Sequence, residues 1–544
     1  MGYRDLYAKF LKFGGRSSPA IEPMSERVEF LETDKSLSEP RLGKGQEDNF
    51  KTAGISAWRQ APFNPTSNPF TGRAYAELIL AFLFDARAWL KRDEPIYILE
   101  LGAGTGAFAF HCLKELQTQK SFFSELQGLD LRYVMTDVAE KNVASWEVHE
   151  RLRLFQNSGL LDYAVYRPER EDSVVVRHAG ITLQPGGLRN PLIVIANYFF
   201  DKTRQDLFRI SDGRLQEILV NSYRDAQPVP SGDPLTSESV KMSETYREIT
   251  DARYADARLN ALLEEYRQQK DATILFPIGA FDCVRNLRRL SGDKLILIAS
   301  GKGVTTVEHF EGPEQPTYSM GGGAASCKVN FHAIGRYFEN LGGRTLSTSD
   351  STLIVQTTMN MLLSQNPCSV EYSRYAFDEI IIRRNPINYL CQCREFLQGA
   401  THANITSYLS FLRMSNFDPV ALSSCGEKIL QALDGINRNR EESLVEVLES
   451  TAANVYEVQS DQNAYLWLGR IYFGLRLYDD CLKMFEASEQ ALGPDIDSLY
   501  FMGACHEAKG DHATARQYYG RALDADPKHE HAHAGIQRTA DHSS

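Results

Sequence analysis

The chain has 544 residues, of which 43% are hydrophobic and 24% charged, and its formal net charge is −12 at pH 7. This composition is typical of a globular protein with roughly two to four domains. It argues against a surface that binds nucleic acid nonspecifically. No apolar run reaches the length that spans a membrane, so we expect neither nucleic acid nor a membrane as a partner.

The nine cysteines are scattered along the chain, and Cys391 and Cys393 lack the second pair that would complete a zinc site. We therefore predict no metal site and a reducing compartment. Residues 1–18, MGYRDLYAKFLKFGGRSS, are basic and mildly amphipathic. They suit either an organelle transit segment or an ordinary first helix. We favour the helix and a cytoplasmic location, with import into an organelle as the alternative.

The chain up to residue 364 alternates between strand-like and helix-like patterns. Short apolar runs predict strands at 96–101, 131–137, 161–169, 191–197, 294–300 and 352–358. Helical periodicity predicts helices at 72–92, 107–117, 140–153 and 329–343. This alternation predicts an α/β domain over residues 1–364, with a doubly wound, mostly parallel sheet.

The alternation is interrupted between residues 201 and 290. Residues 207–220 have the pattern of a hairpin that turns at Asp212 and Gly213. Residues 243–269 and 277–291 look helical. We therefore predict that 201–290 is an insertion or lid between the fourth and fifth strands.

The strand patterns vanish after residue 364, and a helical repeat appears. Gly469 and Gly503 lie 34 residues apart, and the segments around them align. The aligned pairs are Leu468 and Met502, Cys481 and Ala515, Phe485 and Tyr519, and Ser488 and Ala522. This period resembles that of tetratricopeptide repeats. Because two units cannot bury a solenoid core alone, we predict an all-α repeat domain over 365–544, with degenerate helical pairs in 370–460.

The stretch ILELGAGTG is the most informative short segment of the chain. An apolar strand that carries Glu100 runs into Gly102, Gly104 and Gly106. Glycines let the backbone approach a ligand that a side chain would block. With Ala107 they satisfy the dinucleotide pattern G-x-G-x-x-[GA], which is weakly specific by itself.

Two details argue against a dinucleotide. Glu100 would face a pyrophosphate at unfavourable close range, and the third glycine follows at once. S-adenosylmethionine suits this loop better, because it has no phosphate and carries an ammonium, a sulfonium and two ribose hydroxyls. Asp137, after the second strand, is placed to accept those hydroxyls, although it lies further from Gly102 than the usual ~20 residues.

The polar residues of the sheet strengthen this interpretation, because a parallel sheet binds its ligand at the carboxyl ends of its strands. Glu100, Asp137, Asp162 and Asn197 lie at or near strand ends. Together these residues resemble class I S-adenosylmethionine-dependent methyltransferases. The resemblance implies a cofactor loop in ELGAGTG, with Glu100 near the methionine ammonium and Asp137 on the ribose. The candidate cofactor residues are Glu100, Gly102, Ala103, Gly104, Gly106, Asp137, Asp162, Asn197 and Arg73.

A narrower resemblance extends over roughly residues 60–360. IANYFFD resembles the strand-four motif N-E-F-F-D of the MidA-like methyltransferases, whose mitochondrial members methylate an arginine of a respiratory complex I subunit. KLILIASGKG and VNFHAIGRYFENLGG are similar to later family segments. NPFTGRAYAELI is similar to the segment that folds over the cofactor, which implies that Asn68, Arg73 and Tyr75 are neighbours of the cofactor or substrate.

The departure from that family is Tyr198, which stands where the family has glutamate. A carboxylate there could hold a guanidinium with two hydrogen bonds, and tyrosine cannot. The resemblance leaves Asn197, with an aromatic Phe200, as the residue that would hold a target nitrogen. Asp201 could orient a cationic amine or take its proton. The candidate catalytic residues are therefore Asn197, Asp201 and Tyr198.

Three functions fit these observations. The first is a methyltransferase that acts on a protein or peptide, with the repeats recruiting the substrate or a partner. The second is a methyltransferase that acts on a small molecule, with 201–290 as a lid. The third is a scaffold with a methyltransferase fold that no longer turns over. We favour the first.

Overall fold

The computed structural model describes residues 67–224, 227–228, 240–310, 319–321, 324–349, 355–363, 369–385, 404–433, 436–456 and 464–540. The predicted N-terminal helix or transit segment, Cys391 and Cys393 lie outside these residues. Two compact units are present. The first contains Ala74–Ala109 and Leu113–Arg384, and the second contains Ser67–Arg73, Phe110–Cys112 and the residues from Asn385 onward.

The first unit is built on a central sheet, which within the described residues has eight strands. Seven follow the order β16-β17-β12-β6-β1-β2-β3, and β15 pairs with β12. The strands are β1 (Ile96–Leu101), β2 (Leu131–Asp137), β3 (Leu161–Val165), β6 (Leu192–Asn197), β12 (Lys294–Val304), β15 (Val329–Asn330), β16 (Arg344–Ser347) and β17 (Val355–Leu363). From β12 to β3 the strands are parallel, whereas β17 pairs antiparallel with both β12 and β16. The predicted mostly parallel sheet is confirmed.

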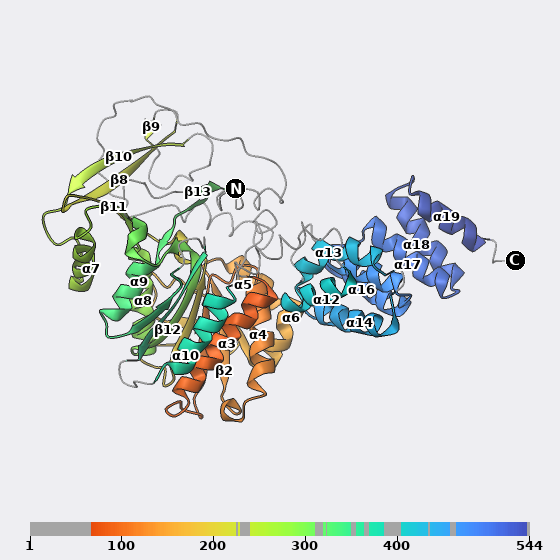
Figure 1. The fold of residues 1–544 in the computed structure, drawn as a ribbon, viewed down its shortest axis with the longest axis horizontal. Helices are drawn as coiled ribbons and strands as arrows, with labels where there is room; N and C mark the ends of the chain where they lie inside the picture. Colours follow the sequence, from red (N-terminus) through yellow and green to blue (C-terminus); the bar gives the residue numbers. More distant parts are fainter. Residues whose placement is uncertain are drawn as a thin grey trace. The chain divides into compact units, whose positions relative to one another are not determined.

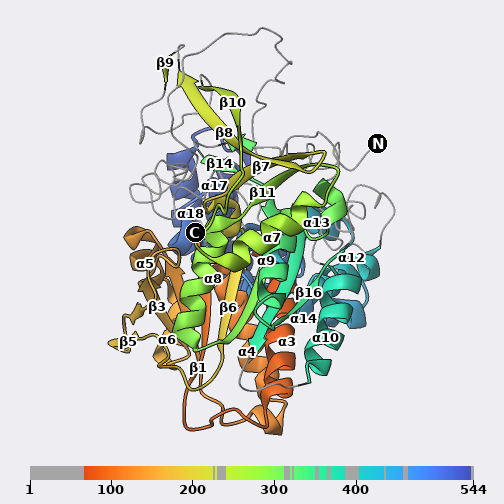
Figure 2. The same ribbon diagram turned by 90° about the vertical axis from the view of Figure 1, so that its left-hand side faces the viewer.

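Helices cover both faces of this sheet (Figures 1 and 2). On one side lie α3 (Pro69–Ala86) and α4 (Ala107–Lys120), and on the other lie α8 (Ile278–Ser291) and α9 (Phe331–Glu339). Strand residues such as Leu99 and Val194 share one buried cluster with Phe281 of α8. Burial on both faces explains why the strands are continuous apolar runs.

Several predicted elements have different limits in the structure, among them α3, which ends at Ala86, and β3, which ends at Val165. Residues 140–153 form two helices, α5 (Glu140–Glu147) and α6 (Glu150–Asn157), instead of one. The last predicted strand continues beyond residue 358 as β17, which pairs antiparallel with β12, and its predicted residues 352–354 lie outside the described residues. The helix predicted at 329–343 is limited to α9, and β16 follows it.

A second, antiparallel sheet lies within the predicted insertion. Its order is β10-β8-β7-β11, with β9 (Gln227–Pro228) beside β8. The strands are β7 (Asp206–Ser211), β8 (Arg214–Arg224), β10 (Val240–Glu248) and β11 (Asp271–Phe276). The predicted turn is confirmed, with φ of 48° at Asp212 and 76° at Gly213.

The helical prediction for 243–269 is wrong over its first residues. Residues up to Glu248 belong to β10, which pairs with β8 along its length, and only α7 (Ala257–Arg267) is helical. The prediction also omitted β11, whose six residues pair with β7. Both strands exist because of pairing with distant partners, which local periodicity does not reveal.

Smaller elements complete the first unit. A hairpin of β4 (Val174–Val176) and β5 (Ile181–Leu183) follows β3, and a hairpin of β13 (Ser319–Gly321) and β14 (Ala324–Ser326) precedes β15. Short turns of 3-10 helix are η3 (Ser124–Leu126), η4 (Phe200–Lys202) and η5 (Val307–Phe310). The unit ends with α10 (Glu371–Ala376) and the π-helix η6 (Phe377–Arg383).

The described part of the second unit, beyond Asn385, is helical. Its helices are α12 (Ile405–Met414), α13 (Pro419–Gln431), α14 (Arg438–Ala452), α15 (Ala464–Gly474), α16 (Tyr478–Leu492), α17 (Ile496–Ala508), α18 (His512–Ala525) and α19 (Glu530–Ala540). One hydrophobic cluster runs from Ile405 to Ala532, so the helices before residue 460 share a core with the repeats. Gly469 and Gly503 hold equivalent places, because an added Cβ would lie 2.6 Å from Phe485 and 2.7 Å from Tyr519 respectively.

The division at residue 364 and the insertion limits of 201–290 stay predictions. Among the helices of the described residues, none has the length and apolar character needed to cross a membrane.

Candidate cofactor-binding site

The glycine loop joins the carboxyl end of β1 to the start of α4. Gly102, Gly104 and Gly106 have φ of 66°, 58° and 85°, which is the left-handed region that glycine adopts without strain. Tertiary bonds fix the loop: the Ala103 N–H donates to the Thr136 carbonyl at 2.9 Å, and Trp146 Nε1 donates to the Gly104 carbonyl at 3.0 Å. The backbone of this loop is therefore held in one shape.

Glu100 is buried beneath the loop, with 4% of its surface exposed. Its Oε2 accepts a hydrogen bond from the Tyr133 hydroxyl at 2.9 Å. Burial raises the pKa of Glu100 from its ordinary 4.5 to about 8, and the nearby Asp137 adds to this rise, while the Tyr133 bond opposes it. A buried carboxyl of this kind would be stabilised in its ionised form by a cation.

Asp137 ends β2 and holds the start of α5. It accepts the Ala139 N–H at 2.9 Å and the Asn142 Nδ2 at 3.0 Å, one on each carboxylate oxygen. Burial raises the pKa of Asp137, although these bonds and the charge of Lys202 oppose the rise. A carboxylate offers about four acceptor positions, so these two bonds leave acceptor capacity for a ligand.

Asn142 also presents an unused polar atom. It is 1% exposed, and its Oδ1 is buried without a partner among the described residues. Together with Asp137 it forms a pair of acceptors at the carboxyl edge of β2.

Asn197 ends β6 beside the loop. Its Oδ1 accepts a hydrogen bond from the Tyr75 hydroxyl of α3 at 2.6 Å. Its Nδ2 is buried and has no partner among the described residues. A buried donor left unpaired costs about 1–3 kcal/mol, and such groups call for a reason such as a bound ligand.

The residues after Asn197 lie against the loop at Gly102. Tyr198 has φ of 49°, a sparsely populated conformation that clusters at functional sites, and its N–H donates to the Ser300 carbonyl at 2.7 Å. The turn brings the Phe199 ring onto Gly102, where an added Cβ would lie 3.1 Å from Cδ2 of the ring. A side chain at Gly102 would therefore collide with Phe199.

Asp201 lies in the next turn, η4, and is 5% exposed. Its backbone carbonyl accepts the Cys327 N–H at 3.3 Å. The pKa of the Cys327 thiol is raised to about 11, mainly by burial and also by the charge of Asp201. Asp201 therefore faces the segment that precedes β15.

Alternation along the strands places three of the predicted residues, together with Tyr133, on one face. Glu100 pairs in register with Ile195, and Ile98 with Tyr133. Because side chains alternate between faces, Glu100, Tyr133, Asp137 and Asn197 point to the same side of the sheet, toward its carboxyl edge.

Asp162 does not join this group. It pairs with Val134, whereas Asp137 pairs with Val165, so it lies about three residues, or roughly 10 Å, before the carboxyl edge. Its oxygens accept the N–H groups of His178 and Ala179, both at 2.9 Å. Asp162 thus holds the turn between β4 and β5.

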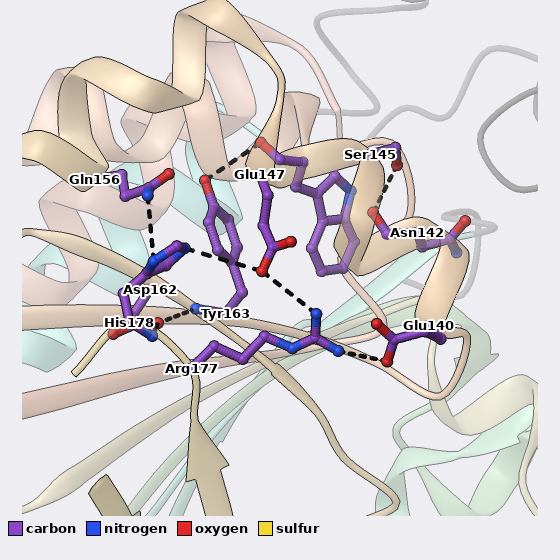
Figure 3. A network of polar contacts seen from close by, with 10 residues as sticks. Glu140, Asn142, Ser145, Glu147, Gln156, Asp162, Tyr163, Arg177 and His178 are labelled. Atoms are coloured by element: carbon purple, nitrogen blue, oxygen red, sulfur yellow. Dashed lines mark hydrogen bonds and ion pairs between the residues drawn. The ribbon is translucent and has the colours of Figure 1, made fainter. Parts of the chain in front are cut away.

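That turn belongs to a polar network that supports α5 (Figure 3). Arg177 bridges Glu140 and Glu147 of α5, with 3.3 Å to the Glu147 carboxylate. The His178 ring lies 3.4 Å from Gln156 Nε2 and 3.9 Å from Glu147. The network fixes the helix that carries Asn142.

Arg73 and Tyr75 have different orientations on α3. It is exposed, whereas Tyr75 is buried, and two residues correspond to about 200° of rotation along a helix. Arg73 therefore points away from the side of α3 that carries Tyr75.

Sequence reasoning did not single out Tyr133, Asn142 or Phe199. Tyr133 could be found only after the register of β1 and β2 was known, because alternation then places it beside Glu100. Asn142 stands in the first turn of the helix after Asp137, a position typical of residues that bind back to a strand end. Phe199 gives no local signal, since its position depends on the strained turn at Tyr198.

Comparison with known proteins gives two matches to family models. Residues 84–299 match the model of a family described as "Putative S-adenosyl-L-methionine-dependent methyltransferase". The matched residues include the glycine loop, Asp137 and Asn197. Residues 496–529 match the tetratricopeptide repeat, which confirms the predicted repeat. Among curated proteins, no sequence matches the chain.

Two crystal structures of Burkholderia thailandensis proteins resemble the fold. One, bound to S-adenosyl-homocysteine, is 13% identical with a TM-score of 0.36, over 57% of this chain and 80% of that one. The other, of an uncharacterized protein, is 14% identical with a TM-score of 0.36, over 61% of this chain and 95% of that one.

Proposed function

We propose that the chain is an S-adenosylmethionine-dependent methyltransferase that acts on a side-chain nitrogen of a protein or peptide. The observation that carries the proposal is the position of Glu100, Asp137 and Asn197 around one glycine loop at the carboxyl edge of the sheet. The match of residues 84–299 supports the same activity.

The residues of this edge fit the cofactor's functional groups. Glu100 is a buried carboxyl suited to an ammonium, which would favour its ionised form. Asp137 and Asn142 offer acceptors suited to ribose hydroxyls. The loop at Gly102 is open to a ligand because it has no side chain, and Gly102 itself is exposed. When bound, the cofactor supplies the methyl group on its sulfonium.

Methyl transfer is an in-line displacement, so the protein's main task is to align a neutral nucleophile. In the proposal Asn197 and Tyr198 form the wall of the acceptor site beside the cofactor. Asp201 takes a proton from a cationic amine or orients it. Because Tyr198 provides no carboxylate, we do not assign arginine as the target. The placement in the MidA-like subgroup also stays a prediction.

The repeats support a protein target. Tetratricopeptide-like helices form extended surfaces that suit peptide binding, and the match of residues 496–529 supports such a role. We propose that they recruit the substrate or a partner. The alternatives are a small-molecule methyltransferase and a scaffold with weak or no catalysis.

Methyl transfer from radiolabelled S-adenosylmethionine tests the proposal. The protein is incubated with an extract from its source, and the proteins and small molecules are then separated. We expect label in proteins, and a variant with Asn197→Ala should transfer far less. Label only in the small-molecule fraction would support the second function, and no label despite cofactor binding would support the scaffold.

A further inference from the structure

The hydrogen bond between Tyr75 and Asn197 fixes which way the Asn197 amide faces. The Tyr75 hydroxyl lies 2.6 Å from Oδ1, so the Nδ2 group is directed away from Tyr75. No described residue accepts a hydrogen bond from Nδ2, although it is buried. The amide therefore presents an unused donor at a defined position.

Tyr75 is itself held in place. It is 1% exposed, and the Phe108 ring meets it edge-on, with ring centroids 5.1 Å apart and an interplanar angle of 80°. Phe108 lies in the first turn of α4, two residues after Gly106. The orientation of the amide is thus tied to the helix that follows the glycine loop.

The register of β1 and β6 locates this donor. Glu100 pairs with Ile195, so the same register continued by two residues brings Asn197 opposite Gly102. Phe199 lies against Gly102, which is consistent with that placement. Alternation puts Asn197 on the same face as Glu100.

The chemistry of the cofactor's amino-acid end then identifies an acceptor. Its ammonium and its carboxylate sit on one carbon, so an ammonium near Glu100 brings the carboxylate into the same part of the loop. Two backbone donors of the loop are already used, since Ala103 N–H binds the Thr136 carbonyl and Gly106 N–H binds the Ala103 carbonyl. The Nδ2 of Asn197 is a neutral donor suited to a carboxylate.

We propose that Asn197 Nδ2 binds the carboxylate at the amino-acid end of the cofactor, and that Tyr75 is a positioning residue that orients the amide for this bond. The inference rests on the proposed function and adds to it how the protein recognises the carboxylate of the cofactor. It assigns Tyr75 a role that acts through Asn197.

Calorimetric titration with two ligands tests this assignment. The first ligand is S-adenosyl-homocysteine, and the second is its decarboxylated form, which keeps the ammonium and loses only the carboxylate. The proteins are the wild type, Asn197→Ala, Tyr75→Phe and the double variant. Tyr337→Phe is the matched control. Tyr337 lies on α9 and is as buried as Tyr75, and its hydroxyl donates a hydrogen bond to Asp256 instead. Melting temperatures verify that each variant is folded.

We expect Asn197→Ala to lower the affinity for S-adenosyl-homocysteine by about tenfold, and Tyr75→Phe to lower it by about threefold. The double variant should match Asn197→Ala, because Tyr75 acts through that amide. Affinity for the decarboxylated ligand should not change in any variant, and Tyr337→Phe should bind both ligands like the wild type. If Asn197 and Tyr75 had only a structural role, their substitution would lower the affinity for both ligands equally.

Several outcomes would overturn the assignment. Equal losses for the two ligands, or no loss for either, would show that Asn197 does not bind the carboxylate. Additive losses in the double variant would remove the positioning role of Tyr75. A folded wild type that binds neither ligand would overturn the proposed function, and the assignment would fall with it.

Discussion

At the scale of a single residue, the raised pKa of Glu100 makes the stability of the protein depend on pH. Glu100 is a buried acid whose polar partner is the Tyr133 hydroxyl, and its pKa is raised to about 8. The folded protein therefore holds a proton that the unfolded chain releases above pH 4.5. The stability contributed by the protonated form is complete below pH 4.5 and is lost as the pH rises through 8.

Glu100→Gln should remove this pH dependence. The amide resembles the protonated acid and does not ionise. In the wild type, ionisation of Glu100 in the unfolded chain lowers the free energy of unfolding by about 1.4 kcal/mol for each pH unit between 4.5 and 8. We expect the melting temperature of the variant to rise relative to the wild type between pH 5 and pH 8. The measurement is thermal unfolding of both proteins across that range. A constant difference between them would contradict the raised pKa.

The residues of the site were predictable to different degrees. Glu100, Asp137 and Asn197 follow from their positions at strand ends, and the structure brings them to one edge. Asp162 also lies near a strand end in the sequence, but at the opposite end of β3, where it binds the turn between β4 and β5. Tyr133 and Asn142 could not be found, because their roles depend on pairing register and on the entry of a helix.

At the scale of elements, the glycine loop depends on backbone conformation and on close contact with Phe199. Gly102 has φ of 66° and would place a Cβ 3.1 Å from the Phe199 ring. Gly180, in the turn between β4 and β5, has φ of 63° and nothing within 4 Å of an added Cβ. The two glycines share a positive φ, which would strain any side chain placed there, and they differ in the contact that the side chain would meet.

Gly102→Ala and Gly180→Ala form a matched pair. Each should lose about 1–2 kcal/mol of stability, because alanine is strained at positive φ. Only Gly102→Ala should also lower the affinity for S-adenosyl-homocysteine, by roughly fivefold or more. The added methyl group would push Phe199 away from the loop. Chemical denaturation and calorimetry measure the two effects. Equal affinities in both variants would exclude Gly102 from the cofactor site.

The elements themselves were predicted where a local pattern determines them. The apolar runs at β1, β2, β6 and β12 suffice for buried parallel strands. In β10 the segment SETYRE is polar and lacks an apolar run, so the strand exists only because β8 supplies its hydrogen bonds. Such pairing is a tertiary effect that overrides local propensity.

At the scale of the whole molecule, the helical repeats have a hydrophobic cluster of their own. The aligned positions Leu468, Met502, Phe485 and Tyr519 are fully buried, which explains why a 34-residue spacing was visible in the sequence. The identity of their partner is not encoded in these core positions, so it could not be predicted. The cytoplasmic location likewise stays a prediction.

Gly503→Ala and Gly520→Ala should change the repeats in opposite directions. A Cβ at Gly503 would lie 2.7 Å from the Tyr519 ring, and such overpacking costs about 1–3 kcal/mol. Gly520 lies within α18 with nothing within 4 Å, so alanine should stabilise the helix by up to about 1 kcal/mol. Thermal unfolding measures both changes. Affinity for S-adenosyl-homocysteine should be unchanged in either variant, and a loss would contradict a cofactor site confined to the first unit.

In the proposed function the glycine loop and Asp137 bind S-adenosylmethionine, and a single titration tests this binding. S-adenosyl-homocysteine is titrated into the wild type, Asp137→Ala and Asp162→Ala, with a melting temperature for each. We expect micromolar binding by the wild type, a loss of affinity of tenfold or more, about 1.4 kcal/mol, for Asp137→Ala, and no loss for Asp162→Ala. A folded wild type that does not bind, or an Asp137→Ala variant that binds equally well, would contradict the proposed binding.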